Sequence, residues 1–220
     1  MKAVTSSKEL DYGWAGVTAI CGIVGIVAYV GTSAASHSTS PIIAVPLLFA
    51  FTFGITVSSI GLYHVLGGTT GSRMALIAAV ANVIAAAQLL AMLMIQISVY
   101  SVVQQPDAAL KAVWWGLDVV WDSYVGTGTI LFALCMFGRR GLGVWFAVPG
   151  LLISGLFLIF NITTFPKPPD TAGLVDLGPL VGLWYLVVYV RLGVSSVLLE
   201  RQHRRLIASL EGSAASSVDG

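Results

Sequence analysis

Six long stretches of almost uninterrupted apolar residues divide this chain, and short segments of turn-forming and polar residues separate them. Each stretch has about the 20 residues that a helix needs to cross the hydrocarbon core of a bilayer. The apolar residues are continuous rather than alternating, which indicates helices and not the strands of a barrel. We therefore predict an all-α fold, a polytopic transmembrane helix bundle. Its six expected spans are residues 14–31, 41–66, 74–102, 113–137, 142–162 and 174–194.

The overall composition supports a membrane protein and excludes several other classes. Hydrophobic residues make up 57% of the 220 positions and charged residues only 10%, with a mean hydropathy of +0.91. An ordinary soluble domain carries about 25% charged residues. The formal net charge of +1 provides no bulk attraction for nucleic acid, so we expect no nucleic-acid partner. After six spans, too few residues remain for a large extramembrane catalytic domain.

The distribution of basic residues predicts the orientation. With six spans, both termini and the second and fourth loops lie on one side, and nine of the eleven Lys and Arg fall there. Only Lys111 and Lys167 fall on the other side. The positive-inside rule then places both termini in the cytoplasm, which fits a protein of the cell (cytoplasmic) membrane. Residues 1–197 form the expected bundle, and residues 198–220 a cytoplasmic amphipathic tail with a disordered end.

Small residues recur inside the expected spans. Gly22 and Gly25, the alanines at 85–87, and Gly126 with Gly128 allow helices to approach closely. Such residues are typical of helix contacts in membranes. We expect them to serve packing.

Two aspartates, Asp118 and Asp122, interrupt the fourth span. Residues four apart share a helix face, on which Trp115 precedes them and Thr129 follows. An aspartate at the centre of a membrane helix costs about 2.5–3.5 kcal/mol on an insertion scale, and less near the interface. Asp122 lies about 10 Å deeper than Trp115, at 1.5 Å rise per residue. We therefore expect both carboxyl groups to face the bundle interior or water rather than lipid.

Neighbouring carboxylates repel each other, so a shared proton, a bound cation or a donor from another helix is needed to stabilise them. The pair is then a proton or cation site, a ligand site, an acid–base pair, or a structural hydrogen-bond network that ties helices together. By depth, its expected neighbours are Gln96, Asn161 and Asp176. Asp176 has a simpler interpretation as the N-cap of the sixth helix. The sequence leaves these alternatives open.

Other chemistry finds little support. His64 ends the second span on the cytoplasmic side, away from the aspartates, and no lysine lies within a span. Cys21 and Cys135 form no metal-ligand spacing, and we expect them to be buried apolar residues. No HExxH, P-loop or GxSxG motif occurs. We predict no catalytic residue, no metal and no cofactor.

The C-terminal half carries a set of motifs in order. They are Gly138-Arg139-Arg140-Gly141, Trp145, Asn161, Thr164-Phe165-Pro166, Leu174-Val175-Asp176-Leu177-Gly178-Pro179 and Trp184-Tyr185. In this part the chain resembles a group of bacterial six-helix integral membrane proteins of unknown function. The resemblance implies a multi-pass bundle in the inner membrane. It implies no activity, cofactor or catalytic residue.

The leading functional hypothesis is a small transporter-like or ligand-sensing bundle with an outward-facing acidic site at Asp118 and Asp122. The alternative is an accessory or interaction subunit of a membrane complex, without chemistry of its own. A membrane enzyme is the third and least favoured class. The expected partners are the lipid bilayer and either further copies of this chain or other membrane proteins.

Overall fold

The computed structural model describes residues 12–36, 41–67, 72–102, 107–137, 139 and 141–216. Regular structure in these residues is entirely helical, which confirms the predicted fold class. The six helices are α1 (Tyr12–Ser36), α2 (Pro41–Leu66), α3 (Ser72–Val102), α4 (Ala108–Met136), α5 (Gly143–Thr164) and α6 (Gly178–Ser216).

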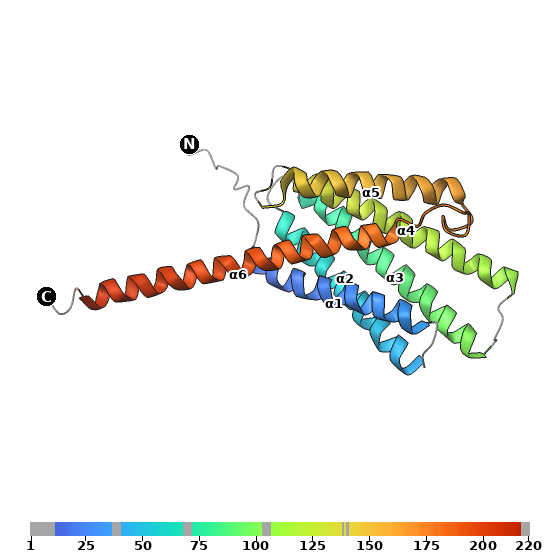
Figure 1. Ribbon diagram of the computed structural model, residues 1–220, viewed down its shortest axis with the longest axis horizontal. Helices are drawn as coiled ribbons and strands as arrows, with labels where there is room; N and C mark the ends of the chain where they lie inside the picture. Colours follow the sequence, from blue (N-terminus) through green and yellow to red (C-terminus); the bar gives the residue numbers. More distant parts are fainter. Residues whose placement is uncertain are drawn as a thin grey trace.

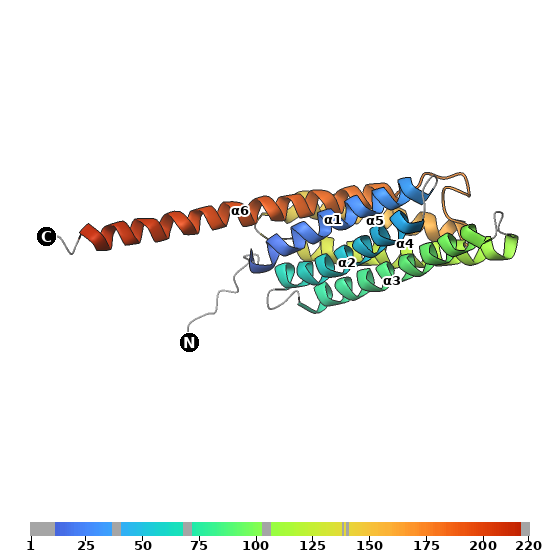
Figure 2. The ribbon, with the colours of Figure 1, turned by 90° about the horizontal axis from the view of Figure 1, so that it is seen from below.

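Consecutive helices run up and down beside one another, and α6 returns to pack along α1 (Figures 1 and 2). The chain therefore closes into a bundle in which α4 contacts α2 and α6 as well as its neighbours in sequence. Helix α1 begins at the end of the bundle where α6 leaves it (Figure 1). The loop between α5 and α6 lies at the opposite end.

All six helices are long and apolar enough to cross a membrane. Large apolar side chains also cover the outside of the bundle, among them Ile20, Phe53 and Leu152, each more than half exposed. A soluble protein rarely exposes so much contiguous apolar surface. This surface is consistent with contact with the acyl chains of a bilayer, and the protein is a multi-pass membrane protein.

The helix ends differ from the predicted spans where acidic side chains cap them. Helix α4 begins at Ala108, five residues before the predicted span, because Asp107 accepts a hydrogen bond from the Leu110 amide at 2.8 Å. Helix α6 begins only at Gly178, whose amide donates to Asp176 at 2.8 Å. Capping by Asp176 is thus confirmed. The polar segments between the predicted spans supply these capping residues, whereas hydropathy identifies only the apolar part of each helix.

Helix α6 continues without a break through Ser216 and extends well beyond the bundle (Figure 1). The predicted boundary between residues 197 and 198 therefore lies inside one continuous helix. Residues 217–220, part of the expected disordered end, lie outside the described residues.

Glycines hold the helices at close distance. The backbones of α1 and α2 meet at Gly25 and Gly54, where a Cβ on Gly54 would stand 2.6 Å from the Cys21 carbonyl oxygen. A Cβ on Gly22 would fall on the ring of Tyr189, and one on Gly126 would stand 2.9 Å from Leu158. The packing role expected of the small residues is confirmed at these positions.

Replacing Gly54 with alanine is expected to destabilise the bundle by about 1–3 kcal/mol, because the added methyl group meets backbone that no rotamer change can move. The measurement is thermal unfolding in detergent. Gly155→Ala in α5 is the matched control, since a Cβ there meets no atom within 4 Å. A Gly54→Ala protein as stable as the control would contradict the close approach of α1 and α2.

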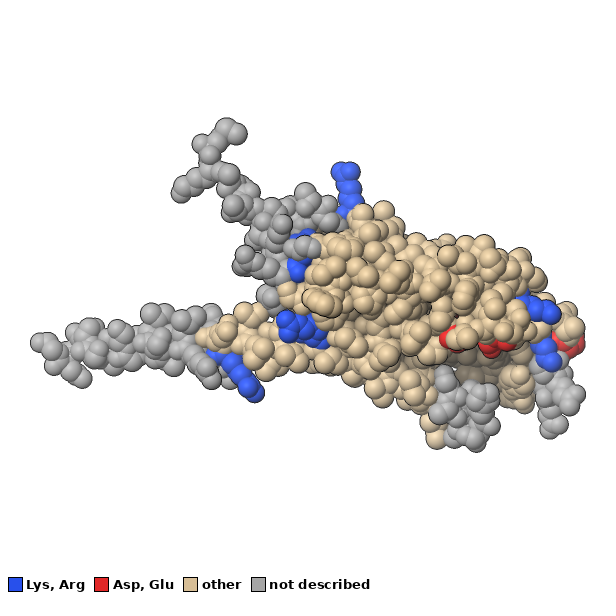
Figure 3. All heavy atoms as spheres, turned by 45° about the horizontal axis from the view of Figure 1, so that its top comes forward, with Lys and Arg blue, Asp and Glu red and all other residues tan. Residues whose placement is uncertain are grey.

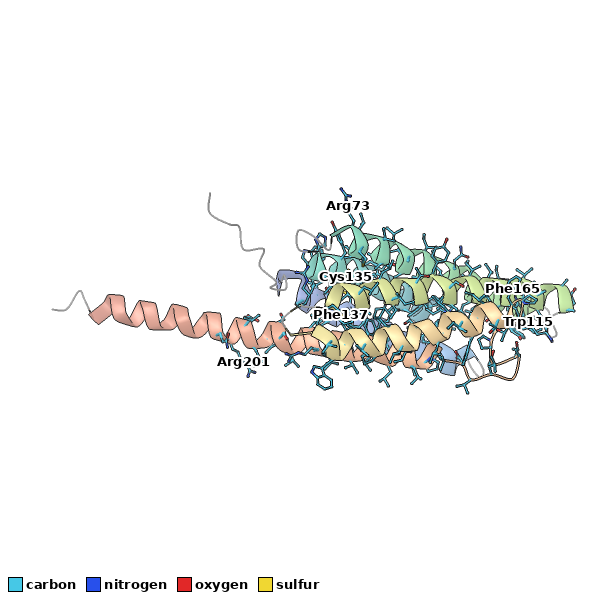
Figure 4. All side chains as sticks on the ribbon, turned by 90° about the horizontal axis from the view of Figure 1, so that it is seen from above. Arg73, Trp115, Cys135, Phe137, Phe165 and Arg201 are labelled. Atoms are coloured by element: carbon cyan, nitrogen blue, oxygen red, sulfur yellow. The ribbon has the colours of Figure 1, made fainter. Side chains whose placement is uncertain are left out.

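Charged side chains are distributed unequally between the two ends of the bundle. On the face in Figure 3, acidic side chains gather toward the end away from the α6 extension, together with a minority of the basic ones. At the other end, Arg139 donates to the Leu66 carbonyl at 2.7 Å and Arg191 to the Gly141 carbonyl at 3.0 Å. Arg73 also lies at this end, and Arg201 lies on the extension (Figure 4). The segregation is what the positive-inside rule needs, and the cytoplasmic placement of the termini stays a prediction.

Candidate cation-binding cavity

A cavity of about 150 Å³ lies inside the bundle, lined by residues from all six helices and from the loop between α5 and α6. Four carboxyl groups contribute to its lining: Asp118, Asp122, Asp170 and Asp176. Two come from α4 and two from the loop. The fold thus brings together acidic residues that lie up to 58 positions apart in the sequence.

Helix α4 carries Asp118 and Asp122 into the cavity wall. Its first turns lie at the α5–α6 loop end, and Figure 4 shows Trp115 and Phe165 at this same end of the bundle. At 1.5 Å per residue, Asp118 lies about 15 Å and Asp122 about 21 Å from the start of α4. Asp122 is 7% exposed and Asp118 is partly buried. The expectation that both acids face the interior is confirmed.

Asn161 of α5 lies beside the Asp122 carboxyl group. Its Nδ2 atom donates to the Phe157 carbonyl at 3.0 Å, one turn earlier in the same helix. Its Oδ1 atom is buried and has no hydrogen-bond partner among the described residues. A buried amide oxygen without a donor is costly, but Asn161 is not part of the cavity lining, so this oxygen is not offered to a species inside the cavity.

The floor of the cavity is a hydrogen-bonded cluster. Nδ2 of Asn82 donates to the Tyr185 hydroxyl at 2.7 Å, and the hydroxyls of Tyr185 and Thr129 share a hydrogen bond of 3.1 Å. Asn82 is 1% exposed, and its Oδ1 atom has no partner among the described residues. This oxygen lies against Gly128, where any Cβ would collide with it. The glycine of α4 therefore makes room for the amide of α3.

A second buried pair continues the polar groups along α6. Tyr189 lies one turn beyond Tyr185, and its hydroxyl shares a hydrogen bond of 3.0 Å with Ser58 of α2. The two tyrosine rings stack with centroids 5.7 Å apart. Hydrogen-bonding groups therefore extend from the acidic residues into the interior of the bundle.

The mouth of the cavity is formed by the proline-rich loop between α5 and α6. Pro168 and Pro169 are buried against the lining, whereas Asp170 and Asp176 are exposed. Asp176 also caps α6, so its carboxyl group serves the helix and the cavity together. The acidic groups thus lead from the exposed loop to the buried Asp122.

All charged side chains in the described lining of the cavity are acidic. Within the described part of the chain, its lining includes four aspartates and neither Lys, Arg nor His. Like charges in a medium of low polarity repel strongly, because water screens them poorly. The same residues include no group of three His, Cys, Asp or Glu that could hold a metal ion. The arrangement is suited to a proton or a cation that does not need a full set of oxygen ligands.

The predicted neighbours of the aspartates fall into two groups. Asp176 lines the cavity, whereas Asn161 lies beside Asp122 but is not part of the lining. Gln96 is in α3 and partly buried, but it is not part of the lining. Gln96 was predicted as a neighbour only from its expected depth in the membrane, and the depth of a residue does not determine the direction of its side chain. That Asp118, Asp122, Asn161 and Asp176 act as a proton, cation or ligand site stays a prediction.

Sequence inspection missed Asp170, Trp121, Tyr185 and Tyr189 as lining residues. A signal for the tyrosines was present, because residues 185 and 189 are four apart and share one face of α6. Asp170 had no such signal, since the path of a loop depends on the helices that it joins.

His64 lies outside the cavity, as the sequence suggested. Its ring stacks on Trp14 with centroids 4.6 Å apart, and it belongs to the last turn of α2. Cys21 and Cys135 are partly buried and lie outside the cavity lining.

Comparison of the chain with protein-family models, with curated proteins and with solved structures finds no match. What defines the protein at this point is its fold and its cavity: a six-helix membrane bundle with an acidic, partly aromatic pocket. The resemblance of the C-terminal half to bacterial six-helix proteins stays a prediction.

Proposed function

We propose that this protein binds a cation in the acidic cavity and acts as a small transporter-like or ligand-sensing bundle. One observation carries the proposal. Four carboxyl groups line a single cavity, and the described residues of that lining bring no basic side chain to neutralise them. Ionisable residues within membrane spans are rare and tend to mark ion or substrate paths.

The direction of entry follows from the charge at the two ends. The basic residues lie mainly at the end away from the α5–α6 loop, which the positive-inside rule assigns to the cytoplasm. Asp170 and Asp176 then stand at the outer surface of the membrane. A cation from outside meets these exposed acids first and Asp122 last.

The test uses Asp118→Asn and Asp122→Asn, because asparagine keeps the shape of the side chain and removes its charge. We expect wild-type protein in liposomes to show cation flux, or a cation-dependent rise in unfolding temperature, with at least one of H⁺, Na⁺, K⁺ or an organic ammonium ion. Each variant is expected to weaken this response about tenfold or more, because a buried charge partner is lost.

Asp107→Asn is the matched control. Asp107 is exposed, caps the same helix and lies outside the cavity lining, and asparagine caps helices equally well. If both cavity variants fold and respond to every cation as wild type does, the proposal fails. The accessory-subunit alternative then takes its place, supported by the length of α6 that projects from the bundle (Figure 1).

A further inference from the structure

The walls of the cavity are unusual for a site that takes a simple inorganic ion. Six of the twenty lining residues are aromatic, and they come from five of the six helices. They are Tyr29, Phe51, Trp121, Phe157, Tyr185 and Tyr189. Aromatic faces attract cations through their quadrupole and also cover apolar surface, so they suit a ligand that has both.

Acidic and aromatic residues share one lining. Asp118 and Asp122 lie on α4 with Trp121 between them in the sequence, and Tyr185, Tyr189 and the fully buried Phe157 belong to the same cavity. Asp170 and Asp176 are the exposed acids of the loop. A ligand with a positive group and an apolar body can therefore place its charge beside the acids and its body among the rings.

The residues present do not suit a hard metal ion. Ca²⁺ takes six to eight oxygen ligands and Mg²⁺ about six. The described residues offer no cluster of three acidic, histidine or cysteine side chains placed to coordinate a metal. An ammonium group needs fewer partners, because it donates a small number of hydrogen bonds to single oxygens.

Acceptors for such a donor are available in the four carboxyl groups of the lining. Oδ1 of Asn82 also has no partner among the described residues, but it is packed against Gly128 of α4, and its Nδ2 atom donates to Tyr185. The carboxyl groups therefore supply the oxygens for an ammonium group, and the described lining holds no positive side chain that would compete with it.

The size of the cavity limits the ligand. About 150 Å³ is comparable to an engineered cavity that holds one benzene molecule. One ring or a short alkyl group therefore fits, together with an ammonium group near the mouth. A polycyclic or long-chain cation does not.

We propose that the physiological ligand of this cavity is a small organic ammonium ion with an apolar body of about one ring. The inference rests on the proposed function and specifies its substrate class. Phenethylammonium is a suitable probe, because it joins one ring to one ammonium group. Methylammonium retains the charge without the ring, and 2-phenylethanol retains the ring without the charge.

The first experiment measures binding of these probes to wild-type protein in nanodiscs by calorimetry and by the shift in unfolding temperature. Phenethylammonium is expected to bind about tenfold or more tightly than either methylammonium or 2-phenylethanol. Equal binding of 2-phenylethanol would overturn the proposal, because it would mean that the cavity is only an apolar pocket. Equal binding of methylammonium or Na⁺ would also overturn it, while leaving the proposed cation site standing.

The second experiment removes one aromatic wall. Trp121→Leu is expected to weaken phenethylammonium binding about tenfold and methylammonium binding by a smaller factor, because only phenethylammonium has an apolar body that packs on the ring. Trp121→Phe is expected to restore most of the affinity. Trp145→Leu is the control, because Trp145 is 85% exposed and outside the lining. If Trp121→Leu binds phenethylammonium like wild type, the aromatic walls do not select the ligand. If no cation binds wild-type protein at all, the proposed function fails together with this inference.

Discussion

Leucine in place of Gly182 is expected to fill the cavity and abolish cation binding while the bundle remains folded. Gly182 is a lining residue on α6, and a Cβ built there meets no atom within 4 Å. The new side chain therefore enters open space rather than a packed contact. To bind, a ligand would have to displace it at a cost of about 3 kcal/mol, which corresponds to an affinity loss on the order of 100-fold.

The measurement is binding of the ammonium and alkali cations to the Gly182→Leu protein, together with its unfolding temperature. Gly155→Leu is the matched control, since Gly155 also lies within a helix, has open space around it and lines no part of the cavity. Both variants make the same chemical change in a membrane helix. Full cation affinity in Gly182→Leu would mean that cations bind elsewhere in the protein.

The sequence was sufficient for the parts of the fold that hydropathy controls. Every predicted span corresponds to a helix, because a segment in hydrocarbon must satisfy its own backbone hydrogen bonds. The same physics predicted that Asp118 and Asp122 face inward, since lipid solvates no carboxylate. The glycines at 22 and 25 were also recognisable, because close helix contacts in membranes need small residues.

The rest of the site depends on contacts between distant segments. Tyr185 faces the cavity because Asn82 and Thr129 hold its hydroxyl, and neither residue is near it in sequence. Asp170 reaches the lining because the loop folds Pro168 and Pro169 back against the helices. Gln96 was selected for its depth and lies outside the lining, because depth fixes only one of the coordinates that decide a contact.

The cavity combines features that stability alone does not favour. Four acidic groups contribute to one small lining, and the Oδ1 atom of Asn82, another lining residue, lacks a partner among the described residues. A bundle selected only for packing would replace these groups with apolar residues of similar volume, often with a gain in stability. Their presence is understandable if a bound cation compensates for them. This difference separates a binding site from a structural network.

A double-mutant cycle on Asp118 and Asp122 tests that difference directly. Without ligand and at alkaline pH, Asp118→Asn and Asp122→Asn are each expected to raise the free energy of unfolding by about 1–3 kcal/mol, because each removes a charge from the cavity. The double variant is expected to gain less than the sum of the two, since the first substitution already relieves their mutual repulsion.

The measurement is reversible unfolding in mixed detergent, with Asp107→Asn as the control that leaves the cavity unchanged. A structural network gives the opposite sign, because loss of a carboxylate that ties helices together leaves its donors unpaired and costs about 1–3 kcal/mol. The sign of the change in the free energy of unfolding therefore distinguishes a binding site from a structural network, even before a ligand is known. Lower stability in both single variants would mean that the acids hold the helices together, whereas higher stability together with lost cation binding means that these carboxyl groups are retained for a ligand.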